Sequence, residues 1–319
     1  MTDLTRRTAL AGAAGLAGCA SMKLPAMNQA REGRVAVEGG SVVWRKFGGG
    51  PKTPLLVVHG GPGVPSDYLE PLAALGDERP VYLWDQLGCG RSDRPSNPAL
   101  WTRERFVSEM AEVRRALGLR RVHILGQSWG TMLTPDYLLA HGSQGVRSVI
   151  LAGPVLSVRR YTDDVRAMVR ELPPEHRAAI AAAEESGQFD TPAYQAATEA
   201  FYAIHLARSP TPETGPLLQR TFEGIGQECY VTMNGPSEFS PIGSLRNYER
   251  VADMAQLTMP FLYLSGEYDT CTPGASRAYA AATPHAEVAV IAEAGHLTTI
   301  DAPDATNHVV RSFLNRVES

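Results

Sequence analysis

Short apolar, β-rich runs alternate with helix-forming stretches along most of this chain, and this alternation constrains the fold more than any other feature. The runs are nearly continuous in Leu, Val, Ile and aromatic residues, as expected for strands buried on both faces of a parallel sheet. We expect strands at 55–58, 81–84, 122–125, 149–151 and 261–264. We expect helices at 103–117, 129–141, 273–282 and 304–317. The repeat predicts an α/β protein with a mostly parallel sheet and helices on both faces.

The region from residue 154 to 250 breaks this pattern. It is rich in helix-forming, charged and aromatic residues, contains several prolines and holds no β-rich run. We therefore expect a helical cap at 154–250, inserted into an α/β core made of residues 34–153 and 251–319. Runs at 35–37 and 42–44, separated by a Gly-rich turn, predict a β-hairpin at the start of the core.

Composition excludes several classes of protein. Of the 319 residues, 44% are hydrophobic and 20% are charged, a balance that is typical of globular proteins and not of disordered chains. Lys+Arg 30 against Asp+Glu 34 gives a formal net charge of −4, without the basic stripe that nucleic-acid binding requires. Beyond the N-terminal segment, Cys89, Cys229 and Cys271 have neither disulfide-framework nor zinc-site spacing, and no metal or cofactor is expected.

The N-terminal segment resembles an export signal. Arg6-Arg7 precedes a weakly hydrophobic run at 9–18 that is too short to span a bilayer, as in twin-arginine signals. Leu16-Ala-Gly-Cys19 resembles a bacterial lipobox, in which the cysteine becomes the lipidated first residue. We expect a signal peptide at 1–18, lipidation of Cys19 and a tether at 19–33, with the protein exported to the periplasmic or cell-envelope side of a bacterial membrane. A disordered leader with a chance motif is the alternative.

A Gly-x-Ser-x-Gly motif marks the first candidate catalytic residue. Gly126-Gln-Ser-Trp-Gly130 follows the apolar run at 122–125 and opens the expected helix at 129–141. In this context the serine lies on a strained strand-to-helix turn, with its hydroxyl exposed at the positive end of the helix. We predict that Ser128 is a nucleophile. A surface serine in a Gly-rich turn is the alternative, which the flanking strand and helix disfavour.

A serine nucleophile needs a general base and an acid that orients this base. In this architecture both follow the serine along the chain, the acid first and the histidine second. Asp269 lies just after the run at 261–264, and His296 lies just after an apolar run at 288–291. Both loops are expected at the same edge of the sheet as Ser128. We predict that Asp269 is the orienting acid and His296 the general base.

A second glycine-rich loop supplies candidate donors for an oxyanion hole. His59-Gly-Gly-Pro-Gly63 directly follows the run at 55–58 and exposes backbone N–H groups. We predict that the N–H groups of Gly61 and Trp129 bind the oxyanion of a tetrahedral intermediate. Chain order argues against His59 as the catalytic base. A purely structural turn is the alternative for this loop.

These motifs together resemble those of the proline iminopeptidase family of α/β-hydrolases, over nearly all of residues 34–317. The segments that carry the resemblance, in family order, are His59-Gly-Gly-Pro-Gly63, Asp85-Gln-Leu-Gly-Cys-Gly-Arg-Ser92, Gly126-Gln-Ser-Trp-Gly130, Met233-Asn-Gly-Pro-Ser-Glu-Phe239 and Gly266-Glu-Tyr-Asp269. The cap is most similar to the branch with archaeal tricorn-interacting aminopeptidase and bacterial L-amino-acid amidases. The resemblance implies a serine enzyme that releases an N-terminal residue, often proline, from a peptide or amide through an acyl-enzyme.

The resemblance also implies that glutamates near the cap bind the free ammonium of the substrate. Glu238 matches one of them, but the chain has Thr270 where aminopeptidase members commonly place a second glutamate after the catalytic aspartate. Burying an ammonium is costly without opposite charge, so Glu223 or Glu228 could supply the missing carboxylate. Trp129 and several cap aromatics could line an apolar pocket, or the cap aromatics could form the cap's own core: Phe201, Tyr202, Phe222, Tyr230 and Phe239.

Several functions remain open at this point. The first is a lipid-anchored serine aminopeptidase or amino-acid amidase whose substrate is a small peptide or amino-acid amide. The second, motivated by Thr270, is an esterase or lactonase that uses the same Ser128, Asp269 and His296 without selecting a free amine. The third is a catalytically silent envelope lipoprotein. The natural substrate and the oligomeric state are left open.

Overall fold

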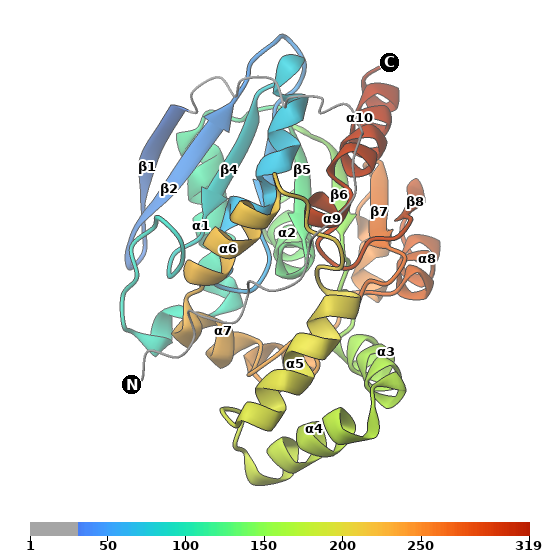
Figure 1. The fold of residues 1–319 in the computed structure, drawn as a ribbon. Helices are drawn as coiled ribbons and strands as arrows, with labels where there is room; N and C mark the ends of the chain where they lie inside the picture. The colour runs from blue at the N-terminus through green and yellow to red at the C-terminus, as the bar shows by residue number, and fades with distance from the viewer. Residues whose placement is uncertain (1–30) are drawn as a thin grey trace.

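A single eight-stranded sheet organises the chain in the computed structural model, which describes residues 31–319 (Figure 1). The order of the strands across the sheet is β1-β2-β4-β3-β5-β6-β7-β8. Their bounds are β1 (Arg31–Val37), β2 (Gly40–Phe47), β3 (Leu55–Val58), β4 (Val81–Asp85), β5 (Val122–Gln127), β6 (Val146–Ala152), β7 (Phe261–Gly266) and β8 (Ala286–Ile291). The β1–β2 hairpin and the β2–β4 pair are antiparallel, and the other pairs are parallel. The predicted mostly parallel α/β architecture is confirmed.

Helices cover both faces of the sheet, and this explains why its central strands are continuously apolar. Every residue of β3 is buried. Leu56 and Val58 belong to one cluster of buried side chains, whereas Leu55 and Val57 belong to another. Since successive side chains of a strand point to opposite faces, the two clusters are the cores on the two faces of the sheet.

The helices predicted at 103–117, 129–141, 273–282 and 304–317 begin at the predicted residue or one residue before it, as α1, α2, α8 and α10. The bounds of the α-helices are α1 (Arg103–Ala116), α2 (Trp129–His141), α3 (Val158–Glu171), α4 (Pro174–Ser186), α5 (Pro192–His205), α6 (Gly215–Glu223), α7 (Gln227–Met233), α8 (Pro273–Ala281), α9 (Thr298–Asp301) and α10 (Pro303–Glu318). Hydroxyls of Thr102, Ser157 and Thr191 accept hydrogen bonds from N–H groups in the first turns of α1, α3 and α5. Shorter 3₁₀ segments are η1 (Ser66–Asp77), η2 (Pro98–Leu100), η3 (Ser244–Asn247) and η4 (Ala252–Gln256). Within residues 31–319, no helix has the length and apolarity needed to cross a membrane.

Helices α3 to α7 lie between β6 and β7 in the sequence, in the region expected to form the cap. In Figure 1, α3, α4 and α5 gather beyond one end of the strands. Helix α6 instead packs against η1 of the core, where Arg220 pairs with Asp67 (3.1 Å) and Glu70 (3.0 Å). The two carboxylates are nearly buried, so these contacts fix α6 to the core.

The expected tether is wrong at its C-terminal end. Arg31, Glu32 and Gly33 belong to β1, where they pair with Lys46, Arg45 and Trp44 of β2. Because β1 is an edge strand with many exposed positions, it carries charged residues and lacks the apolar alternation on which the prediction relied. The predicted signal peptide at 1–18, Cys19 and the remainder of the tether lie outside the described residues.

Glu318 fixes the C-terminal end of α10 to the sheet. Its carboxylate accepts hydrogen bonds from the Thr53 backbone N–H (3.0 Å), from Arg79 (3.1 Å) and from Nε2 of His123 (3.1 Å). The Arg79 side chain is fully buried. Burial alone would raise the pKa of Glu318, but these hydrogen bonds lower it to about 2. Burial lowers the pKa of His123 to about 4, so His123 is neutral at pH 7.

We predict that Glu318→Gln lowers the free energy of unfolding at pH 7 by about 1–2 kcal/mol, because the buried Arg79 cation loses its closer carboxylate partner. The matched control is Glu287→Gln, which removes a half-exposed ion pair with Arg316 and is expected to change stability by about 0.5 kcal/mol or less. Urea unfolding of both variants measures the difference. Equal midpoints for the two variants would contradict the anchoring role of Glu318.

Candidate active site

Ser128 lies in a strained turn between β5 and α2. Its φ of 53° and ψ of −118° are rare for a residue with a side chain. The glycines on either side are required by close backbone contacts. A Cβ on Gly126 would lie 2.2 Å from the Gly130 carbonyl oxygen, and a Cβ on Gly130 would lie 2.3 Å from the Val58 carbonyl oxygen. The Gly-x-Ser-x-Gly spacing therefore follows from packing between β5, α2 and β3.

The backbone N–H and carbonyl of Ser128 both form hydrogen bonds, whereas its hydroxyl does not cap α2. The N–H donates to the Ala152 carbonyl at the end of β6 (2.9 Å), and the carbonyl accepts from Thr131 N–H (2.7 Å) and Oγ1 (2.6 Å). The side chain makes no capping hydrogen bond to α2. These contacts fix the residue and leave Oγ available for chemistry.

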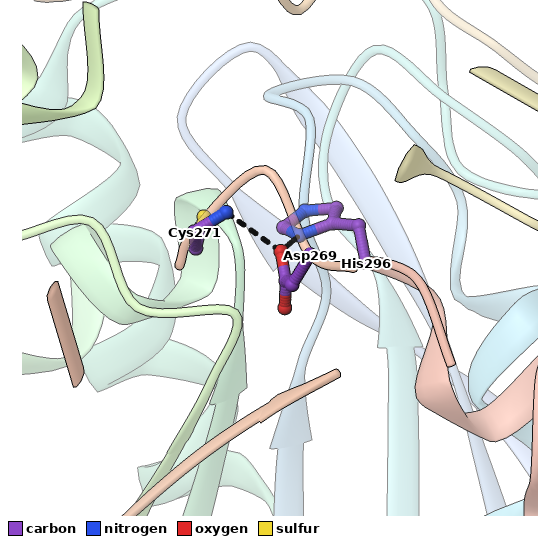
Figure 2. A group of neighbouring side chains, drawn as sticks. All are labelled: Asp269, Cys271 and His296. Carbon is purple, nitrogen blue, oxygen red and sulfur yellow. Dashed lines mark hydrogen bonds and ion pairs between the residues drawn. The ribbon is translucent and has the colours of Figure 1, made fainter. Parts of the chain in front are cut away.

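Asp269 and His296 form a buried hydrogen-bonded pair (Figure 2). They follow β7 and β8, which are parallel neighbours, so their loops meet at one edge of the sheet. His296 Nδ1 lies 2.7 Å from Oδ1 of Asp269. The same oxygen accepts from the backbone N–H of Cys271 (2.7 Å), and Oδ2 accepts from that of Gly266 (3.3 Å). Backbone donors thus hold the carboxylate in place beneath the imidazole.

This pairing leaves Nε2 as the free nitrogen of His296. Within the described part of the chain, Nε2 is buried and has no hydrogen-bond partner. Burial alone would lower the pKa of His296, but the charge and hydrogen bond of Asp269 outweigh burial and raise it above the ordinary value. The side chain of Gln127, beside Ser128 in the sequence, donates to the His296 carbonyl (3.3 Å). The histidine loop therefore contacts the turn that carries Ser128.

Gly153 is a site residue that the sequence reasoning missed. Its φ is +58°, and a Cβ there would lie 2.6 Å from Cε1 and 2.8 Å from Nδ1 of His296. Only glycine leaves room for the imidazole against the end of β6. Its position directly after a predicted strand, at the same sheet edge as Asp269, was the signal that could have found it.

The glycine-rich loop after β3 is tied to the serine turn through Gln86. His59 is fully buried; its Nδ1–H donates to the Gly60 carbonyl (2.8 Å), and its Nε2 accepts from the Gln86 N–H (2.8 Å). Burial lowers the pKa of His59, which keeps it neutral. The Gln86 side chain donates to the His59 carbonyl (3.1 Å) and accepts from Nε1 of Trp129 (2.9 Å). Both His59 nitrogens thus have structural partners, and His59 is no candidate for the base.

A small cavity of about 20 Å³ brings most of the predicted site residues together. Core residues contribute Gly61, Ser128, Trp129 and Met132, and the cap region contributes Val155, Val158, Tyr161, Asn234, Glu238, Pro241 and Leu245. The predicted nucleophile, both predicted oxyanion donors and the predicted ammonium ligand therefore line one cavity. Its wall is otherwise mostly apolar.

The cap aromatics divide between different roles. Phe201 and Phe239 pack edge to face with ring centroids 5.1 Å apart, and Phe239 also packs on Tyr194. Phe201 and Phe239 are buried, whereas Phe222 is exposed. Phe201 and Phe239 therefore form the cap's own core, and the apolar cavity wall comes from Met132, Val155, Val158 and Leu245.

Glu238 is held at the cavity by phenol groups. Tyr230 donates to its Oε1 (2.6 Å). The Tyr161 hydroxyl, which has one proton, lies 2.8 Å from the Glu238 backbone carbonyl oxygen and 3.1 Å from Oε2, and the Glu238 backbone N–H donates to the Tyr202 hydroxyl (3.3 Å). Burial, together with the charge of Glu238, raises the pKa of these three tyrosines, so they stay protonated. Neutral donors thus orient one carboxylate into the cavity that contains Ser128.

Comparison with known proteins identifies the family. Residues 53–303 match the alpha/beta hydrolase fold family. A proline iminopeptidase of Heyndrickxia coagulans is 39% identical over 289 residues, which are 90% of this chain and 99% of the relative. One from Levilactobacillus brevis is 40% identical over 257 residues, 80% of this chain and 86% of the relative. The chain belongs to the proline iminopeptidase family of α/β-hydrolases. The crystal structure of a Mycobacterium smegmatis proline iminopeptidase superposes with a TM-score of 0.80 at 31% identity, covering 90% of this chain and 98% of that one.

Neither Glu223 nor Glu228 replaces the carboxylate that family members commonly have at the position of Thr270. Thr270 itself is fully buried. Glu228 is exposed and accepts from Trp101 Nε1 (2.7 Å), and Glu223 is exposed and accepts from a side chain of its own helix. Neither lines the cavity. Among the described residues that line this cavity, Glu238 is the single carboxylate.

Asp269, Cys271 and His296 also bring potential metal-ligand atoms within 4.8 Å of one another. The hydrogen bonds in Figure 2 explain this cluster without a metal, because Asp269 Oδ1 already accepts from His296 and from the Cys271 backbone. Burial raises the pKa of the Cys271 thiol well above its usual range, which disfavours the thiolate that metals bind. The cluster is best described as the acid–base pair of a serine hydrolase.

We predict that the acid limb of the pH–kcat/KM profile lies above pH 6.5, because Asp269 raises the pKa of His296 and only neutral His296 accepts a proton. Asp269→Asn removes the two largest causes that raise the pKa of His296 and leaves burial and the smaller effect of Glu238, so the acid limb moves to lower pH while the rate falls by roughly 10⁴-fold. Hydrolysis of an activated ester between pH 5 and 9 measures both effects. A limb that stays in place in Asp269→Asn would contradict the assignment of His296 as the base.

Proposed function

We propose that this chain is a serine aminopeptidase that releases an N-terminal residue, proline or another hydrophobic residue, from peptides or amino-acid amides. The observation that carries the proposal is the position of the Glu238 carboxylate in the same small cavity as Ser128. An esterase has no need of a carboxylate beside its nucleophile. A substrate with a free ammonium beside the scissile carbonyl does need one, since a buried cation requires opposite charge.

The proposed mechanism proceeds through an acyl-enzyme. Ser128 Oγ attacks the carbonyl carbon while its proton passes to Nε2 of His296, which Asp269 holds in the required tautomer. The N–H groups of Gly61 and Trp129 stabilise the oxyanion. Collapse of the tetrahedral intermediate breaks the C–N bond, and His296 returns the proton to the leaving amine. Water then attacks the acyl-enzyme by the same steps and releases the free residue.

The lining of the cavity supports a compact apolar acyl group. The side chains of Met132, Val155 and Leu245 form an apolar wall that suits a residue such as proline. Glu238 and the Asn234 side-chain oxygen are acceptors for its ammonium. An N-acetyl group would remove the charge and add bulk against Glu238, so acylated substrates are expected to react poorly.

We predict that the enzyme cleaves L-prolyl-p-nitroanilide and leaves the N-acetylated analogue almost uncleaved. Ser128→Ala is expected to lower the turnover of L-prolyl-p-nitroanilide by several orders of magnitude.

Glu238→Gln keeps the shape of the side chain but removes its charge. It is expected to lower kcat/KM for the free-amine substrate by about 100-fold and to leave the hydrolysis of p-nitrophenyl acetate unchanged. Glu223→Gln, on the exposed surface of α6, is the matched control. Steady-state kinetics on the form that begins at residue 20 measures all of these effects.

The second candidate function is the esterase or lactonase, which Thr270 favours because this residue removes one expected carboxylate. Equal rates for the free and acetylated anilides, or cleavage of esters alone, would support it and overturn the aminopeptidase proposal. Failure of a fluorophosphonate to label Ser128 in folded protein would instead favour a catalytically silent lipoprotein.

We also propose that the protein is exported and anchored to a bacterial membrane by lipid on Cys19, after removal of residues 1–18. The support is the order of Arg6-Arg7, the weakly apolar run and Leu16-Ala-Gly-Cys19. Expression of the full chain in a bacterium with twin-arginine export is expected to give membrane-bound protein with an acylated N-terminal cysteine, and Cys19→Ala is expected to abolish the acylation. Mass spectra in which residues 1–18 remain, or in which Cys19 is unmodified, would contradict the proposal.

A further inference from the structure

A chain of buried hydrogen bonds connects the three loops of the active site. The Gly60 N–H donates to the Tyr68 hydroxyl (2.8 Å), and this hydroxyl donates to Oε1 of Gln127 (2.5 Å). Nε2 of Gln127 then donates to the carbonyl of His296 (3.3 Å). Tyr68 is 1% exposed and Gln127 is 4% exposed. We call this chain the Tyr68–Gln127 bridge.

The donors and acceptors of Tyr68 and Gln127 set the direction of each hydrogen bond in the Tyr68–Gln127 bridge. A phenol has a single proton, which Tyr68 gives to Gln127, and its oxygen accepts from Gly60. A primary amide both accepts and donates, so Gln127 passes the connection from Tyr68 to His296. Burial raises the pKa of Tyr68 far above its ordinary value, so the donor persists at every working pH.

The bridge ends next to atoms that the proposed mechanism uses. Gly60 directly precedes Gly61, the proposed oxyanion donor, and Gln127 directly precedes Ser128. The loops are in close contact, because a Cβ on Gly60 would lie 2.6 Å from Gln127 Oε1 and 2.9 Å from Ser128 Cβ.

Element η1, which carries Tyr68, makes a second connection to the histidine loop. The Tyr68 carbonyl accepts from the hydroxyl of Thr299 in α9 (2.7 Å), just beyond His296. Tyr68 therefore contacts the oxyanion loop and the serine turn through its hydroxyl, and the histidine loop through its backbone.

We propose that Tyr68 and Gln127 are positioning residues that set the distances between the oxyanion donor at Gly61, the Ser128 nucleophile and the His296 base. Serine catalysis depends on these distances, since a displacement of about 1 Å at a catalytic group can cost about 100-fold in rate. Without the phenol hydroxyl, the Gly60 N–H and Gln127 Oε1 would be buried without partners, and both loops would shift to satisfy them.

The chain offers a matched control for this proposal. Tyr263 in β7 is also fully buried, and its hydroxyl makes one short hydrogen bond to Thr283 (2.6 Å), at the C-terminal side of α8. Tyr263→Phe thus removes a buried phenol hydrogen bond of the same kind without touching the three loops. A merely structural role for Tyr68 predicts that both tyrosines behave alike.

The inference rests on the serine mechanism of the proposed function but not on its substrate, so the test uses p-nitrophenyl acetate and a fluorophosphonate. Tyr68→Phe is expected to lower kcat and the second-order rate of Ser128 labelling by about 10- to 100-fold, with KM changed by about twofold or less. Tyr263→Phe is expected to keep both rates within about twofold, although both variants lose a similar amount of thermal stability.

Gln127→Glu is the second variant, because it keeps an acceptor for Tyr68 but cannot donate to the His296 carbonyl. It is expected to lower both rates as well. Wild-type rates in Tyr68→Phe, or equal losses in Tyr68→Phe and Tyr263→Phe, would overturn the positioning role. A wild-type protein that resists the fluorophosphonate would instead refute the serine mechanism, and labelling without cleavage of prolyl anilides would refute only the substrate assignment.

Discussion

The positive φ of Ser128 is the constraint on which the rest of the active site depends. A conformation of this kind costs of order 1–3 kcal/mol and persists only when the surrounding structure enforces it. Here the close packing of Gly126 and Gly130, and the hydrogen bond from Ser128 N–H to the end of β6, enforce it. The strain has a chemical consequence, because it turns a serine at the N-terminus of α2 away from capping and leaves its hydroxyl free.

Two carboxylates, the fully buried Asp269 and the partly buried Glu238, have different supports and different roles in the proposed mechanism. Backbone N–H groups and His296 hold Asp269, which stabilises the imidazolium that forms during proton transfer. Phenols hold Glu238, which leaves its charge uncompensated by any cation in the described cavity lining. A free ammonium on the substrate would supply that compensation. In the proposed mechanism, selection of a free amine and acyl transfer therefore occur in one small cavity.

Much of the core and the candidate site could be predicted from the sequence, because strand runs and turn motifs are local patterns. Asp269 and His296 were predictable since parallel strands bring their loops to one edge, and the structure pairs them. Tyr68 escaped prediction because its importance is a tertiary distance that no spacing encodes. The position of Gly153 near the end of a predicted strand placed it at the site edge, but only the structure shows its close contact with His296. Likewise η1 contains Pro71, which disfavours the prediction of a helix there, and β1 begins with charged residues that only an edge strand permits. From the sequence, the cap aromatics could line the substrate pocket or form the core of the cap. In the structure, Phe201 and Phe239 pack in the core of the cap.

In the proposed mechanism, Ser128 carries the acyl group of an amine-bearing substrate. Mass spectrometry of protein quenched in acid during turnover of L-prolyl-p-nitroanilide tests this role directly. We expect a fraction of the enzyme to be heavier by one prolyl group, with the added mass on the peptide that contains Ser128 and absent in Ser128→Ala. Steady turnover with Ser128 unmodified, or the added mass on another residue, would contradict it.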